Sequence, residues 1–270
     1  MKREALTAAI IQARMGSTRL PGKVLKDIVG KPMLWHLINR VEKSQCKGNS
    51  IIATTRDKKD DAIEDFAKEY HLRIYRGSEK DIVDRYYKAA GTYNADVIVR
   101  IWGDCPLIDP EIIDKTIAQF VRYKADYANN FNPPTFPTGM NVEIYRFNTL
   151  ERIRKETNDP FFREYPMEYI YANQQSFRAV YVKHDIDLSD IHWTVDYRED
   201  FELITTIFVE LYSKHRVFTM KHILDLIDKH PELRERNKGL KRNIEYTKEL
   251  TERRELIGKN EHRENKKRGS

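Results

Sequence analysis

Long apolar runs are missing from this chain of 270 residues, and cysteine is scarce. No stretch approaches the roughly 20 apolar residues that a membrane-spanning helix needs, so we expect no membrane span. The segment before the first strand-like run is too short for a signal peptide, and we therefore expect a cytoplasmic protein. The two cysteines, Cys46 and Cys105, lack the spacing of a metal site, and we interpret them as ordinary thiols.

The excess of positive charge is confined to the C-terminal end. The formal net charge is +6, from 48 basic and 42 acidic residues. Residues 234–270 contain 13 basic and 7 acidic residues, so the rest of the chain holds 35 of each sign. A balanced globular part does not favour nucleic-acid binding, and no nucleic-acid partner is expected. We predict one domain at 1–237 and a polar, basic, helical or disordered tail at 238–270.

Strand and helix signals alternate through the first half of the chain. Short apolar runs predict strands at 6–12, 50–54, 72–75 and 96–101. Amphipathic segments predict helices at 32–41, 60–70, 81–93 and 109–123. This order predicts an α/β fold in which a mostly parallel sheet carries helices on both faces.

The pattern changes after residue 127. The segment 129–137 is a loop rich in asparagine and proline. Further strands are predicted at 140–145 and 177–182, and helices at 147–156, 160–173 and 198–212. Residues 128–190 are therefore predicted to form a small mixed-strand extension that closes over a site.

A basic, glycine-containing loop follows the first predicted strand. Residues 12–23, called the signature loop below, read Gln-Ala-Arg-Met-Gly-Ser-Thr-Arg-Leu-Pro-Gly-Lys. Glycines let backbone N–H groups turn toward an anion, and Arg14, Arg19 and Lys23 offer donors that suit phosphate oxygens. The loop matches neither G-x-x-x-x-G-K-[ST] nor G-x-G-x-x-G. On chemistry alone, it predicts either a triphosphate-binding loop or a solvated turn.

Two aspartates stand at the ends of apolar segments that are far apart in the sequence. Asp104 follows Gly103 after the strand predicted at 96–101, and Asp196 ends a run at 192–195 that we predict to be a strand. Mg²⁺ takes few protein carboxylates and completes its octahedron with phosphate oxygens and water. Asp104 and Asp196 are therefore candidate metal ligands. A turn cap for Asp104 and a helix N-cap for Asp196 are the alternatives.

Together these motifs resemble the cytidylyltransferases of surface-polysaccharide synthesis, in particular the spore-coat (SpsF-type) branch. CMP-ketodeoxyoctulosonate and CMP-acylneuraminate synthetases are better-known relatives. The resemblance begins at residues 10–25 and continues at 30–33, 53–55, 77–78, 84–86, 100–106, 139–143 and 193–196. It implies a nucleotide-diphospho-sugar transferase-like (Rossmann-like) fold and CTP as co-substrate.

The resemblance also implies roles for individual residues. Lys23, Arg19 and Asp104 would be catalytic, and Asp104 and Asp196 would hold Mg²⁺. The nucleotide would contact Gln12, Ala13, Arg14, Gly16, Ser17, Arg19, Lys23, Thr54, Arg85 and Gly103, with backbone around Gln12 and Ala13 reading the cytosine. The acceptor would contact Asn141, Glu143 and Arg163.

One position departs from the family pattern. The ulosonate synthetases usually carry glutamine immediately before the Gly-Asp pair, whereas this chain has Trp102, which cannot make the same hydrogen bonds. An ordinary ulosonate acceptor is therefore in doubt. In the acceptor region, Glu143 is a candidate base, and Arg163 with Glu164 is equally consistent with a surface pair.

The resulting hypothesis is a Mg²⁺-dependent cytidylyltransferase that joins CMP from CTP to a sugar acid, carboxylate or phosphate metabolite and releases pyrophosphate. A homodimer is expected by resemblance. A glycosyltransferase of related fold is the alternative, although Gly103-Asp104-Cys105 lacks the D-x-D expected there. A non-catalytic nucleotide-binding module, with a tail that docks on a membrane surface or nucleic acid, is the third.

Overall fold

The computed structural model describes residues 5–242, 244–253 and 255. The chain divides into two compact units, Met1–Lys238 and Gly239–Ser270, one residue from the predicted boundary at 237. In the second unit, residues 244–253 are helical. The predicted tail beyond residue 255 lies outside the described residues.

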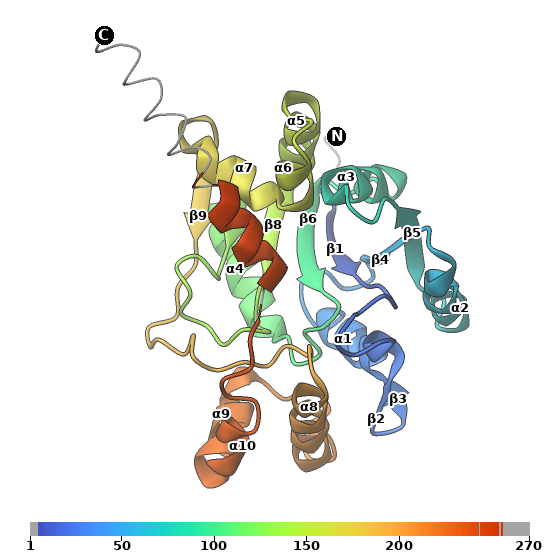
Figure 1. Cartoon of the computed structure of the whole chain (residues 1–270), viewed down its shortest axis with the longest axis vertical. Helices are drawn as coiled ribbons and strands as arrows, with labels where there is room; N and C mark the ends of the chain where they lie inside the picture. Colours follow the sequence, from blue (N-terminus) through green and yellow to red (C-terminus); the bar gives the residue numbers. More distant parts are fainter. Residues whose placement is uncertain (1–4, 243, 254, 256–270) are drawn as a thin grey trace. The chain divides into compact units, whose positions relative to one another are not determined.

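In the described part of the first unit, seven strands form one sheet in the order β5-β4-β1-β6-β8-β7-β9 (Figure 1). The strands are β1 (Thr7–Gln12), β4 (Ser50–Thr55), β5 (Arg73–Gly77), β6 (Val97–Trp102), β7 (Tyr127–Asn129), β8 (Glu143–Arg146) and β9 (Ala179–Tyr181). Every strand runs in the same direction except β8, which is antiparallel to β6 and β7. The predicted mostly parallel sheet is confirmed, and its reversed strand lies in the predicted mixed-strand region. A separate hairpin pairs β2 (Asp27–Ile28) with β3 (Lys31–Pro32).

Helices connect these strands. They are α1 (Met33–Val41), α2 (Asp61–Glu69), α3 (Ile82–Thr92), α4 (Pro110–Arg122), α5 (Phe147–Glu156), α6 (Pro160–Glu164), α7 (Pro166–Ala172), α8 (Arg198–Leu211), α9 (Met220–Lys229) and α10 (Glu232–Glu235), with short 3-10 turns η1 (Lys23–Leu25), η2 (Lys58–Asp60) and η3 (Gln174–Ser176). The single helix predicted at 160–173 is in fact α6 and α7. Proline disfavours helical backbone in the residue before it, so the helix is interrupted at Tyr165, before Pro166.

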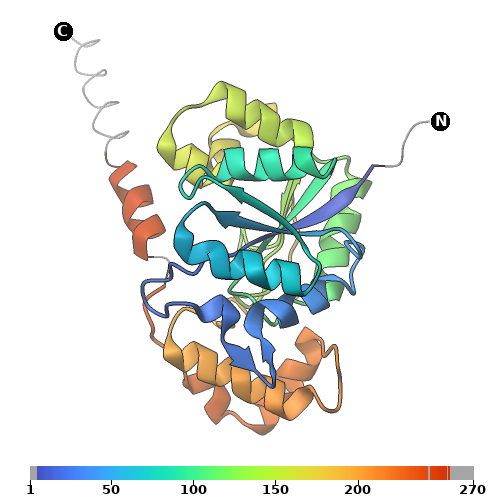
Figure 2. The ribbon, with the colours of Figure 1, turned by 90° about the vertical axis from the view of Figure 1, so that its right-hand side faces the viewer.

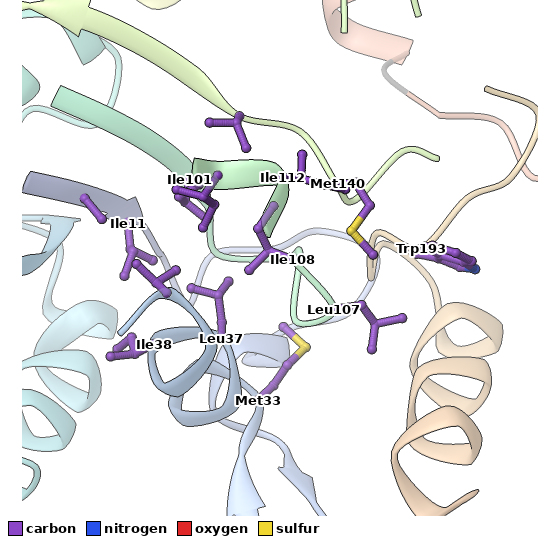
Figure 3. Packing of buried hydrophobic residues seen from close by; sticks show 14 of the residues in the cluster. Ile11, Met33, Leu37, Ile38, Ile101, Leu107, Ile108, Ile112, Met140 and Trp193 are labelled. Carbon is purple, nitrogen blue, oxygen red and sulfur yellow. The ribbon is translucent and has the colours of Figure 1, made fainter. Parts of the chain in front are cut away.

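Hydrophobic clusters cover both faces of the sheet because alternate strand residues point in opposite directions. Ile11 of β1 packs with Leu37 of α1 in one cluster, whereas Ile10 packs with Tyr86 of α3 in the other. Figure 2 shows α3 and α5 on one side of the sheet and α1 and α8 on the other. Figure 3 shows that the first cluster extends from Ile11 toward Trp193, so it reaches the segment that precedes α8.

The central strands end together at one edge of the sheet. Gln12, the last residue of β1, pairs in register with Ala53 on β4 and Trp102 on β6. Ligands of open α/β sheets bind outside such carboxyl ends. The signature loop and Asp104 both continue from this edge. Among the described residues, no helix has the length and apolar character needed to cross a bilayer.

Candidate active site

The signature loop joins β1 to η1 and folds around one carbonyl group. The Met15 oxygen accepts hydrogen bonds from the N–H groups of Ser17 at 2.9 Å and Gly22 at 3.1 Å. Gly22 has a φ of 69°, a left-handed conformation that favours glycine. The N–H groups of Gly16 and Thr18 donate no hydrogen bond within the part of the chain that the structure describes. These two donors are therefore available to an anion.

Lys23 is the centre of the site. Its Nζ lies 3.1 Å from Asp104 Oδ2 and 3.2 Å from Asp196 Oδ1, and it donates to the Val195 carbonyl oxygen at 2.5 Å. The residue is 7% exposed. Burial by itself would lower the pKa of Lys23, but the carboxylates of Asp104 and Asp196 raise it above the ordinary lysine value. Lys23 is therefore a charged ammonium at neutral pH.

The two arginines of the signature loop are also paired with carboxylates. Arg14 Nη1 lies 2.8 Å from Glu79 Oε1, in an exposed pair. Arg19 Nη2 lies 3.1 Å from Asp196 Oδ1, and its guanidinium stands 4.8 Å from the centre of the Tyr197 ring. When a phosphate binds, each cation of this loop would therefore exchange its carboxylate partner for phosphate oxygens.

Asp196 reaches the site on an extended segment outside the sheet. The predicted strand at this position is wrong, because the pairing is limited to an isolated bridge between His192 and Thr138. The Val195 N–H instead donates to the Asp104 carbonyl oxygen at 2.9 Å. This bond joins the two segments that carry the candidate metal ligands.

Asp196 is held by residues that follow it. The N-cap of α8 is Tyr197, so the alternative interpretation of Asp196 as the cap is wrong. Asp200 Oδ2 accepts from the N–H groups of Asp196 and Tyr197, each at 2.9 Å. Asn237 Nδ2 donates to Asp200 Oδ1 at 2.8 Å and to the His192 carbonyl at 2.9 Å. The turn that presents Asp196 is therefore braced from the end of the first unit.

Asp104 and Asp196 fit a Mg²⁺ site that a nucleotide would complete. Both carboxylates contact the same ammonium, so they face a common point. The described residues contain no group of three His, Cys, Asp or Glu side chains able to hold a metal. Two carboxylates plus phosphate oxygens and water are an ordinary Mg²⁺ ligand set. A metal ion would share these carboxylates with Lys23.

A buried polar network lies behind the site. Gln12 Oε1 accepts from Tyr86 Oη at 2.7 Å and from Arg100 Nη2 at 3.3 Å. Arg100 Nη1 lies 2.8 Å from Glu143 Oε2, and Tyr127 Oη donates to Glu143 Oε1 at 2.7 Å. Glu143 is 0% exposed. Glu143 thus serves as a buried counter-ion, and this geometry gives no support to its prediction as an acceptor ligand or base.

The other predicted acceptor residues lie in different environments. Arg163 donates to Asp81 Oδ2 from Nε at 3.0 Å and from Nη2 at 2.5 Å, and to the Arg154 carbonyl oxygen at 2.9 Å. It therefore ties α6 to α5 and to the start of α3. Asn141 is half-buried and lies two residues before β8. The acceptor roles of both residues stay predictions.

The backbone predicted to read cytosine already makes hydrogen bonds. The Ala13 N–H donates to the Ala53 carbonyl oxygen at 3.3 Å, and the Gly103 N–H donates to the Gln12 carbonyl oxygen at 2.8 Å. A Cβ on Gly103 would stand 2.4 Å from that Gln12 oxygen. Glycine is therefore required at position 103 by the close approach of β1 and β6.

Two buried residues of the predicted nucleotide set carry polar atoms without a partner among the described residues. These atoms are Thr54 Oγ1 and Arg85 Nε. Arg85 also donates from Nη1 to the carbonyl oxygens of Ser78 at 2.5 Å and Glu79 at 3.2 Å. Buried polar groups are normally hydrogen-bonded, so these two atoms are exceptions, and the nucleotide roles of Thr54 and Arg85 stay predictions.

Trp102 forms part of an aromatic and cationic cluster at the end of β6. Its ring packs edge-on to Phe131, with centroids 5.6 Å apart, and the Arg100 guanidinium lies 4.5 Å from the Trp102 ring centre. The half-buried indole is thus held at the carboxyl end of β6 and is not enclosed in the core. Trp102, immediately before Gly103 and Asp104, therefore presents an aromatic surface.

Cys46 and Cys105 are free, buried thiols, as predicted. Burial raises the pKa of Cys46 to about 12. Burial, together with the charge of Asp104, raises the pKa of Cys105 well above the ordinary thiol value. Neither cysteine has the thiolate character of a nucleophile at neutral pH.

Several residues that shape the site were not predicted from the sequence. Asp60, Asp200 and Asn237 belong to no recognisable motif, yet each accepts or donates hydrogen bonds that hold a site segment. The acid-rich start of the helix predicted at 198–212 was the available signal for Asp200. No comparable signal marks Asp60 or Asn237.

Comparison with known proteins gives a consistent result. A family model described as cytidylyltransferase matches residues 8–257. The chain is 34% identical over 236 residues to an uncharacterized protein of Methanocaldococcus jannaschii, covering 86% of this chain and 94% of the relative. It is 30% identical over 236 residues to the spore coat polysaccharide biosynthesis protein SpsF of Bacillus subtilis, covering 83% and 94%.

A solved structure extends the similarity to three dimensions. A cytidylyltransferase from Leptospira borgpetersenii superposes with a TM-score of 0.82 at 32% sequence identity, over 88% of this chain and 100% of that one. The family model, which matches residues 8–257, spans the signature loop and both aspartates.

Proposed function

Since the chain belongs to the cytidylyltransferase family and is a nucleotidyltransferase, we propose that it transfers CMP from CTP to the oxygen of a sugar acid, carboxylate or phosphate metabolite. The observation that carries this proposal is the convergence of Lys23 from the signature loop on Asp104 and Asp196. A protonated lysine beside two carboxylates is suited to a Mg²⁺–triphosphate substrate.

In the proposed reaction the acceptor oxygen forms a bond to the α-phosphorus, and the bond from that phosphorus to the pyrophosphate oxygen breaks. Such in-line transfer depends on positioning and charge stabilisation more than on covalent help from the protein. Lys23, Arg14 and Arg19 would hold the phosphate oxygens, together with the free N–H groups of the signature loop. Mg²⁺ held by Asp104 and Asp196 would neutralise charge on the triphosphate.

The acceptor decides whether a base is needed. A carboxylate or phosphate acceptor is already ionised at neutral pH and attacks without one. A hydroxyl acceptor would need a base, and both oxygens of Glu143 are engaged by Arg100 and Tyr127. The site therefore favours an ionised acceptor.

The direct test incubates the protein with CTP, Mg²⁺ and a panel of sugar acids, carboxylates and phosphorylated metabolites. Release of pyrophosphate that depends on one acceptor, with formation of its CMP derivative, is the expected result. ATP, GTP and UTP serve as matched donors. Turnover of a nucleotide sugar without pyrophosphate release would instead support the glycosyltransferase alternative.

Asp104→Asn and Asp196→Asn should each lower the rate of pyrophosphate release by about a hundredfold or more, since each removes a charged Mg²⁺ ligand. Raising the Mg²⁺ concentration should recover part of the loss, and chelation with EDTA should abolish activity of the native protein. Asp187→Asn, at an exposed aspartate between β9 and α8, is the control and should act like the native protein. Equal rates in all variants would contradict the proposed metal site.

A homodimer and a cytoplasmic location also belong to this proposal. Light scattering coupled to size-exclusion chromatography would measure the first, and cell fractionation the second. A monomer with full activity would show that one chain completes the site.

A further inference from the structure

We propose that Asp60 is a positioning residue that clamps the signature loop for CTP, an inference that rests on the proposed function. Asp60 ends η2 and is 2% exposed. It lies 45 positions from Met15 in the sequence, yet its Oδ1 accepts a hydrogen bond from the Met15 N–H at 2.7 Å. Met15 is also the residue whose carbonyl organises the turn of the signature loop.

The second oxygen of Asp60 is fixed by the end of β4. Oδ2 accepts from the Thr55 N–H at 3.1 Å and from the Thr55 hydroxyl. The same hydroxyl accepts from the Asp57 N–H at 3.1 Å. Asp60 therefore connects the signature loop to a central strand of the sheet through one rigid carboxylate.

The chemistry of this contact requires a carboxylate. Three donors approach two oxygens from two directions, and an ionised aspartate accepts at both ends. An asparagine would turn its NH₂ group toward either the Met15 or the Thr55 N–H, so it could not satisfy both. Asp60 forms no salt bridge among the described residues, although its charge acts on the buried Arg85 guanidinium.

The Asp60 carboxylate lies directly against the loop that is proposed to bind the triphosphate. A buried carboxylate close to a loop that binds a triphosphate opposes the ligand's charge. This repulsion is offset because Asp60 fixes Met15 while the N–H groups of Gly16 and Thr18 stay free to bind the ligand. Asp60 thus consumes one donor of the loop in order to orient the others, which raises affinity by lowering the ordering cost of binding.

The test compares Asp60→Asn with Asp61→Asn. Asp61 is the adjacent residue, 58% exposed, and it pairs with Arg76, so its substitution makes the same charge change without touching the signature loop. Titration calorimetry of CTP with Mg²⁺, without acceptor, should show a dissociation constant about tenfold higher for Asp60→Asn, which corresponds to about 1.4 kcal/mol. Asp61→Asn should match the native protein, and the acceptor KM should be unchanged in both.

Hydrogen exchange separates this role from a merely structural one. Without nucleotide, exchange in residues 13–22 should rise in Asp60→Asn, whereas exchange in α2 should not. An increase confined to α2, or equal CTP affinity in the two variants, would overturn the proposal. If the native protein bound no CTP, the proposed function would fail, while the exchange of residues 13–22 would still decide whether Asp60 clamps the loop.

Thr55 supplies variants that keep the carboxylate. Thr55→Val removes one donor to Asp60 and should weaken CTP binding about threefold, a smaller effect than Asp60→Asn because two donors remain. Thr55→Ser keeps the hydroxyl and should restore native affinity. Equal affinity of Thr55→Val and Thr55→Ser would contradict the clamp even if Asp60→Asn failed to fold.

Discussion

Pyrophosphate release by Lys23→Met is expected to fall by about a thousandfold, with the protein still folded. Lys23 is the charged group in contact with both candidate metal ligands, and loss of one preorganised donor to a developing anion typically costs about 10²–10³ in rate. The effect should appear mainly in kcat. Methionine preserves the length and apolar character of the buried stem, so packing should change little.

Lys26→Met is the matched control for this variant. Lys26 is exposed, its Nζ lies 5.9 Å from the centre of the Phe201 ring, and it forms no salt bridge with Asp104 or Asp196 among the described residues. Its substitution should leave the rate within about twofold of the native value, as expected for a solvated surface charge. A rate for Lys23→Met within tenfold of the control rate would contradict a catalytic role for Lys23.

Lys23→Met should also change how the protein binds metal alone. The ammonium of Lys23 occupies the space between Asp104 and Asp196. Without it, the two carboxylates repel each other and attract a divalent cation. Titration with Mn²⁺ in the absence of nucleotide should therefore show tighter binding to Lys23→Met than to the native protein.

Glu143→Leu is expected to lower the free energy of unfolding by about 3–5 kcal/mol, because it leaves the Arg100 guanidinium without its carboxylate in the core. The side chains of this pair are 5% and 0% exposed. Urea unfolding followed by circular dichroism measures the change. The double variant Arg100→Met/Glu143→Leu should recover much of the loss, since it removes both charges together.

An acceptor role for Glu143 makes a different prediction. In that case Glu143→Leu would raise the acceptor KM while the free energy of unfolding stayed near the native value.

Glu79→Gln is the control for the stability measurement. It breaks the exposed pair with Arg14 and should change the free energy of unfolding by less than about 1 kcal/mol, as expected for a surface ion pair.

The order of strands and helices in the first half of the chain could be predicted because hydrophobic periodicity is a local property. Both boundaries of β1, β4 and β6 lie within one residue of the predicted ones. The segment before Asp196 was misread for the same reason. Its apolar residues pack into the core near Met140 and Leu107, and nothing local shows that they do so without strand partners (Figure 3).

The candidate site could be predicted only where its residues fall in a motif. Lys23, Asp104 and Asp196 were identified, and the structure brings them into direct contact. The residues that hold the surrounding segments, Asp60 and Asn237, were not identified, because they act through backbone groups distant in sequence. The burial of Glu143 could not be predicted, because an acidic residue on an alternating strand gives no sign of whether its face is buried.

The brace from Asn237 to Asp200 has a consequence for when the enzyme becomes competent during its own synthesis. The signature loop and all seven strands of the described sheet precede Asp196 in the chain, and Asn237, which braces its turn, comes later still. A nascent chain that stops short of residue 237 would carry Asp196 without the side chain that braces its turn. We therefore expect activity to appear only after almost the whole first unit has left the ribosome.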